Sequence, residues 1–134
     1  MKKSLLISVL LFTVAASYAA SPALPDTLQK EARAAIDKGL AWLVANQKEG
    51  GFWSDERNPA MTALPVWAIS AAGVTTYSSQ VDRAVAYILS NAQPDGGIYV
   101  PDPRRGGAGL GNYNTSLCMM GLHATGRKIG RAHV

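Results

Sequence analysis

The chain contains two related stretches, Ile36-Asp37-Lys38-Gly39-Leu40-Ala41-Trp42-Leu43-Val44-Ala45-Asn46 and Val81-Asp82-Arg83-Ala84-Val85-Ala86-Tyr87-Ile88-Leu89-Ser90-Asn91. Asp, Ala and Asn recur at matching places, with basic, aromatic and aliphatic residues conserved in type between them. Each stretch leads into a glutamine and two glycines, in Gln47…Gly50-Gly51-Phe52-Trp53 and in Gln93…Gly96-Gly97-Ile98-Tyr99. Such self-similarity is typical of a repeat protein. The sequence therefore predicts two copies of one unit, over about 27–73 and 80–126.

Each unit has the apolar spacing of a helical hairpin. The first helix is predicted over about 27–46, and the apolar residues that share its inner face are Ala32, Ile36, Leu40, Leu43 and Val44. The corresponding helix of the second unit is predicted over about 80–91. No stretch alternates with period two over a useful length, so we expect an all-α fold.

The second helix of each unit is predicted over about 62–72 and 115–125. Thr62 is the expected N-cap of this helix in the first unit. That cap would place Pro65 in the first turn, where a missing N–H costs little. Its expected inward residues are Leu64, Trp67, Ala68 and Ala71. Gly73 and Gly126 follow the two helices, at the position that favours a left-handed residue.

The first residues are typical of a secretory signal peptide. Lys2 and Lys3 precede the apolar run 5–15, and small residues at Ser17 and Ala19 fit a cleavage site after Ala19. The run is short for a membrane span. We expect an exported protein, periplasmic or secreted, with 1–19 removed and no transmembrane segment.

Charge and cysteine content narrow the class of partner. The formal charge of +4 falls to +2 without Lys2 and Lys3, and to +1 without Arg131. A nearly neutral mature chain gives no indication of nucleic acid binding. Cys118 is the single cysteine, so the chain cannot form an internal disulfide.

The segment Lys38-Gly39-…-Trp42-…-Gln47-…-Gly51-Phe52-Trp53 resembles the QW motif of squalene–hopene and related terpenoid cyclases. Arg83-…-Tyr87-…-Gln93-…-Gly97-Ile98-Tyr99 resembles a weaker second copy. Tyr113-Asn114-Thr115-Ser116-Leu117 resembles the start of an inner helix in the same α/α toroid superfamily, which includes the protein prenyltransferases. The resemblance covers 28–127 and implies helical-hairpin repeats of an α/α toroid.

In those families the QW segment is a structural clasp rather than a catalytic site. The resemblance gives that role to Gln47, Gly51 and Trp53, and more weakly to Gln93, Gly97 and Tyr99. The chain must turn sharply there, and the paired glycines permit backbone angles that other residues avoid. We expect Gln47 to bond helix-end groups that lack an intrahelical partner, and Trp53 to cover the end of the neighbouring hairpin.

The catalytic groups of these families are missing from their expected places. Terpenoid cyclases use an Asp-x-Asp-Asp motif, whereas the closest acid pair here, Asp55-Glu56, reads as a solvated loop. Where protein prenyltransferases have a zinc-binding His in Tyr-His-Thr, this chain has Tyr113-Asn114-Thr115, and asparagine is a poor zinc ligand. Cys118 and His123 fall on different helix faces. We therefore expect no catalytic residue, no metal and no cofactor in this chain.

The glycine-rich segment 106–111 lacks the pattern of a phosphate-binding loop and reads as a flexible connection between helices. Loops between hairpin helices can rim the central cavity of a toroid. The residues that we expect at such a rim are Arg104, Arg105, Tyr113 and Asn114. The ligand implied by the resemblance is an isoprenoid or another apolar molecule, and the oligomeric state stays open.

Two hairpins are fewer than a ring needs, since repeat proteins require about three units to bury enough apolar surface. Written back into codons, Ile129–Val134 matches the start of a common short-read sequencing adapter, followed by a stop. We therefore expect 128–134 to be an artefact and the chain to be an N-terminal fragment.

The sequence leaves three alternative functions open. The first is an exported terpene cyclase/mutase-like repeat protein, inactive as a fragment. The second is a non-catalytic extracytoplasmic toroid that binds a lipid, a glycan or a protein. The third is an exported polysaccharide lyase on a related toroid.

Overall fold

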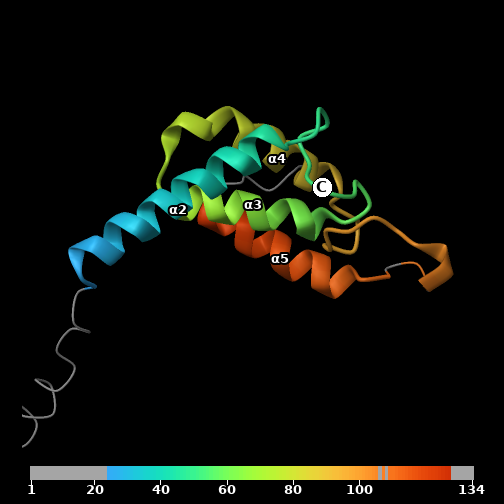
Figure 1. Cartoon of the computed structure of the whole chain (residues 1–134). Coiled ribbons are helices and arrows are strands. Elements are labelled where there is room, and N and C mark those ends of the chain that lie inside the picture. Colours follow the sequence, from blue (N-terminus) through green and yellow to red (C-terminus); the bar gives the residue numbers. More distant parts are fainter. Residues whose placement is uncertain (1–23, 106, 108, 128–134) are drawn as a thin grey trace, which may run out of the picture. The chain divides into compact units, whose positions relative to one another are not determined.

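The computed structural model describes residues 24–105, 107 and 109–127 (Figure 1). Its helices are α2 (Asp26–Ala45), α3 (Pro59–Ala71), α4 (Ser78–Ser90) and α5 (Gly111–Ala124), with short 3-10 turns η1 (Thr75–Tyr77) and η2 (Pro103–Arg105). The described residues form no strand, only isolated bridges from Ala92 to Ile98 and from Asp102 to Gly107. The all-α prediction is confirmed. The predicted signal peptide, 1–19, and the predicted artefact, 128–134, lie outside the described residues.

The chain divides into two compact units, Met1–Ala34 and Ala35–Val134. The described part of the first unit is 24–34, where Gln29 Nε2 donates a hydrogen bond to the Leu24 carbonyl at 2.6 Å. The second unit holds the rest of α2 together with α3, α4 and α5. Everything that follows concerns this second unit.

Helices α3 and α5 lie side by side in the second unit and run in the same direction, while α4 runs the opposite way against α3 (Figure 1). The connections from α2 to α3 and from α4 to α5 therefore lie at one end. Apolar side chains between the helices form the core, which includes Val66, Ile69, Val81, Ala84, Ile88 and Cys118. Burial of these side chains is what holds the helices together.

Helix α3 begins earlier than predicted. Asn58 is its N-cap and Pro59 takes the first helical position, where a proline is favoured. The prediction that Pro65 lies in the first turn is therefore wrong: Pro65 lies inside α3 and has no N–H for the carbonyl one turn back. Thr62 is no N-cap, because it lies inside α3; its hydroxyl accepts a hydrogen bond from the Trp53 N–H at 3.2 Å.

The predicted inner faces also differ from the observed ones. In the second unit, α2 buries only Leu40, and Ile36 is 53% exposed. Trp67, predicted to point inward, is 44% exposed. Helix α3 instead buries a set that includes the small residues Ala60 and Ala63, because α5 and α4 cover it from two sides.

The two helix C-termini match the prediction closely. Gly73 and Gly126 follow α3 and α5 with φ of +67° and +64°. Gly73 donates its N–H to the Ser70 carbonyl and Gly126 to the His123 carbonyl, each at 3.1 Å. Both hairpins thus end their second helix with the same left-handed glycine.

Candidate functional site

Gln47 joins the turn after α2 to α4, the first helix of the next hairpin. Its Nε2 donates to the Gly51 carbonyl at 3.0 Å and to the Gln80 carbonyl in α4 at 2.9 Å. Its Oε1 accepts a hydrogen bond from Arg83 Nη2 at 2.5 Å. Gln47 thus bridges two hairpins, but through a carbonyl within the first turn of α4 and an arginine side chain. The expected bonds to helix-end groups without an intrahelical partner are not those observed.

Gly51 brings the same turn against the backbone of α4. It has a φ of +82°, and a β-carbon at this position would stand 2.5 Å from the Arg83 carbonyl oxygen. Atoms cannot approach so closely, so position 51 requires glycine for two reasons: its backbone angle and its neighbour. Gly50, by contrast, does not have a positive φ.

Trp53 closes its own hairpin. It is 5% exposed, and its indole Nε1–H donates to the Leu43 carbonyl in the last turn of α2 at 2.7 Å. Carbonyls in the last turn of a helix lack an intrahelical N–H, so this bond caps the C-terminus of α2. Trp53 was expected to cover the end of a neighbouring hairpin; its indole hydrogen bond instead lies within its own hairpin.

Hydrogen bonds in the turn after α4 repeat those in the turn after α2 at a constant offset in residue number. With that offset, Gln93 is not the counterpart of Gln47. Asn46 Nδ2 donates to the Trp42 carbonyl as Asn91 Nδ2 does to Tyr87, each at 2.8 Å. The Ile98 N–H donates to the Thr115 hydroxyl at 2.9 Å, as the Trp53 N–H does to Thr62. Ile98 is therefore the counterpart of Trp53.

By the same offset, Gly96 is the counterpart of Gly51, with a φ of +86° against +82°, and Ala92 is the counterpart of Gln47. The predicted pairing of Gln93, Gly97 and Tyr99 with the first motif is therefore one residue out. Gln93 Nε2 bonds the carbonyls of Asn91 and Tyr99 in its own turn, at 3.2 and 2.9 Å.

Asn114 ties α5 to the start of α3. It is 4% exposed, its Oδ1 accepts the Ala60 N–H at 3.1 Å, and its Nδ2 donates to the Leu110 carbonyl at 3.3 Å. The N–H groups of a first helical turn lack intrahelical partners, so Asn114 caps α3 from a neighbouring helix. The polar groups of this predicted rim residue are thus already engaged.

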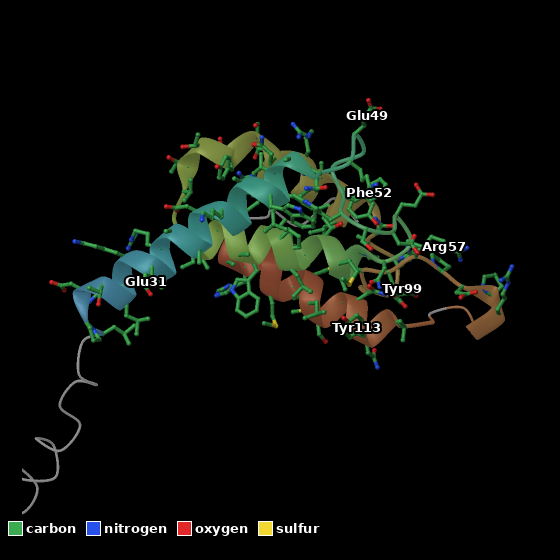
Figure 2. The ribbon with its side chains drawn as sticks, in the orientation of Figure 1. Glu31, Glu49, Phe52, Arg57, Tyr99 and Tyr113 are labelled. Atoms are coloured by element: carbon green, nitrogen blue, oxygen red, sulfur yellow. The ribbon has the colours of Figure 1, made fainter. Side chains whose placement is uncertain are left out.

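A polar cavity of about 220 Å³ lies beside Asn114. Its lining residues are Asp55, Arg57, Asn58, Val100, Asp102, Gly109, Leu110 and Asn114. The Asn58 Oδ1 is buried and has no hydrogen-bond partner among the described residues. Arg104 and Arg105 lie on η2, where Arg104 is exposed, and Tyr113 is 47% exposed. Of the predicted rim residues whose side chains the structure describes, Arg104, Tyr113 and Asn114, only Asn114 lines this cavity. Figure 2 shows Phe52, Arg57, Tyr99 and Tyr113 at this same end of the unit.

An apolar groove of about 400 Å³ lies between the end of α2, its turn and α3. Its lining residues are Trp42, Leu43, Asn46, Lys48, Trp53, Ser54, Met61, Leu64 and Pro65. Trp42 is 62% exposed at its edge. Sequence reasoning missed this groove, although the exposed indole of Trp42 comes from the motif that it singled out.

Cys118 is fully buried, as expected for a structural thiol, and burial raises its pKa to about 12. Burial likewise raises the pKa of Tyr87 to about 12, with smaller contributions from Cys118, Asp55 and Glu56. A thiol that stays protonated is a poor nucleophile. Within residues 24–105, 107 and 109–127, no three His, Cys, Asp or Glu side chains gather as metal ligands would.

No family model matches the chain, and no curated protein or solved structure is significantly similar to it. In the described part of the chain, no helix has both the length and the apolar character needed to cross a bilayer.

Proposed function

We propose that this chain is part of an exported α/α toroid of the terpenoid cyclase and prenyltransferase type, and that its inner helices supply wall for an apolar ligand such as an isoprenoid. The proposal takes terpene cyclisation as the reaction of the complete protein and assigns no chemical step to these residues. The QW-like sequence supports the proposed family, and the signal-like N-terminus supports the proposed export.

The observation that carries the proposal is a pair of exposed apolar side chains at equivalent places. Since Thr62 corresponds to Thr115, Trp67 corresponds to Met120. They are 44% and 45% exposed, on two parallel helices that pack side by side. A repeated apolar patch of this kind favours an apolar ligand over a glycan.

The experiment is equilibrium dialysis of radiolabelled farnesol against the purified mature chain. We expect saturable binding, and a loss of about tenfold in affinity for Trp67→Ala and for Met120→Ala, which corresponds to about 1.4 kcal/mol. Leu110→Ala, which removes an apolar side chain that is 49% exposed outside the patch, is the control. No saturable binding, or equal affinity in all four proteins, would refute the proposal.

A further inference from the structure

The groove of the second hairpin is filled by the first hairpin. The ring centroids of Tyr87 and Phe52 lie 5.3 Å apart, and the Tyr87 hydroxyl donates to the Glu56 carbonyl at 2.5 Å. Asn114 accepts the Ala60 N–H. The segment from Phe52 to Ala60 thus covers the face that α4, its turn and α5 present.

The equivalent groove of the first hairpin is open. Trp42, Leu43 and Met61, which line it, correspond to Tyr87, Ile88 and Asn114. Trp42 is 62% exposed and Leu43 half-buried, whereas Ile88 and Asn114 are 0% and 4% exposed. The chain therefore presents one unfilled copy of a surface that it fills elsewhere.

Helix α5 carries an exposed counterpart of the α3 surface that packs against the second hairpin. On α3, the residues that are fully or almost fully buried include Ala60, Ala63 and Val66. Their counterparts on α5 are Tyr113, Ser116 and Met119, which are all exposed, Met119 to 61%. The chain thus carries a second copy of each surface that makes the contact between hairpins: the open Trp42 groove and the exposed face of α5. Neither copy has a partner among the described residues.

We propose that these two faces bind each other between two copies of this chain, with the α5 edge of one copy seated in the Trp42 groove of the next. The contact continues the packing of α3 on α5 and is heterologous, since each copy uses a different face. Side-chain sizes are complementary: the indole of Trp42 replaces the smaller ring of Tyr87, and Gly97 replaces Phe52.

One difference sets how closely the two copies approach. Gly121 packs so tightly on α3 that a β-carbon there would stand 2.7 Å from the Ala63 carbonyl oxygen. Its counterpart on the open face is Ala68, whose β-carbon keeps the second copy slightly farther away. We therefore expect weaker packing between copies than within one, with a Kd on the order of 10 µM.

The test is sedimentation velocity of the mature chain across a concentration series, with two variants at exposed positions that leave the core untouched. Ala68→Lys blocks the groove face, and Met119→Lys blocks the α5 face. Each variant alone is expected to stay monomeric, while their equimolar mixture forms a dimer through the one intact pair of faces. Both substitutions introduce the same charge, so a mixed dimer cannot arise from attraction between them. Circular dichroism checks that each variant is folded.

A wild-type chain that stays monomeric up to about 100-fold above the expected Kd would overturn the proposal; it would point to further hairpins of a longer chain as the natural cover. Association of either variant alone, or a mixture that stays monomeric, would also overturn it. If a variant fails to fold, Ala68→Gly provides the opposite test. It removes the obstructing β-carbon and is expected to tighten association about threefold; unchanged or weaker association contradicts the proposal.

Discussion

Gly121 lies directly against the backbone of Ala63, so close that a β-carbon at position 121 would stand 2.7 Å from the Ala63 carbonyl oxygen. This contact joins α3 and α5, the second helices of the two hairpins, at backbone distance. It makes the spacing of α3 and α5 sensitive to a single methyl group.

Substitution of Gly121 by alanine should therefore destabilise the chain. The added methyl group must push α5 away from α3, and overpacking of this kind costs about 1–3 kcal/mol. Gly39→Ala is the matched control, because a β-carbon there meets nothing within 4 Å and the helix gains about 0.5–1 kcal/mol. Urea denaturation measures both, and a Gly121→Ala variant as stable as the wild type would contradict the packing described.

Replacement of Asn114 by alanine should loosen the start of α3. The Ala60 N–H would lose its acceptor in a buried position, at a cost of about 1–3 kcal/mol. Asn112→Ala, at an exposed position on the same helix, should change stability by no more than about 0.5 kcal/mol. Amide hydrogen exchange at Ala60 should quicken only in the first variant; equal exchange in both would show that Asn114 is no cap.

Gln47 and Arg83 should be coupled energetically, because the glutamine accepts the arginine hydrogen bond across the two hairpins. A double-mutant cycle with Gln47→Leu and Arg83→Met should give a coupling of about 0.5–1 kcal/mol. Gln93, whose described bonds stay in its own turn, provides the control pair: Gln93→Leu and Arg83→Met should be additive. Equal coupling in the two cycles would show that Gln47 has no specific interaction with Arg83.

Stability should fall at alkaline pH through the buried Cys118 and the partly buried Tyr87. Burial raises the pKa of Tyr87 from 10.0 to about 12 and that of Cys118 from 9.0 to about 12. A group whose pKa is higher in the folded state stabilises fully below its unfolded pKa, and this stability is lost as the pH rises through the folded pKa. The free energy of unfolding should therefore decline from about pH 9 to pH 12. Denaturation at increasing pH should show a flatter decline for Tyr87→Phe with Cys118→Ala, and an identical decline would refute this origin.

The four helices could be predicted from the sequence, because apolar periodicity is a local signal. The register of the second turn could not. Gln93 and Gly97 match Gln47 and Gly51 by residue type, whereas hydrogen bonds align Ala92 and Gly96 with them. A backbone turn depends on its hydrogen bonds and its positive φ, and a nearby residue of the same type can mislead an alignment of letters.

The helix starts and inner faces depended on tertiary contacts that periodicity does not carry. Pro65 suggested a late start for α3, but Pro59 and the cap from Asn114 begin it earlier. Trp67 was expected inside, yet it is exposed, and α3 approaches α5 closely through the small residue Ala63. The cap from Asn114 was missed because it joins residues far apart in the chain, Asn114 and Ala60.

The parallel direction of α3 and α5 has an electrostatic consequence. Each helix carries a macrodipole equivalent to roughly half a positive charge at its N-terminus, and two parallel dipoles reinforce each other instead of cancelling. Their positive ends lie together at the end where α2 turns into α3 (Figure 1). Arg127, which pairs with Asp82, lines a pocket with Ser70 and Ala124 and so lies near their negative ends. If an amphiphile with an anionic head bound along these helices, the combined dipole would favour the orientation with that head toward the positive end.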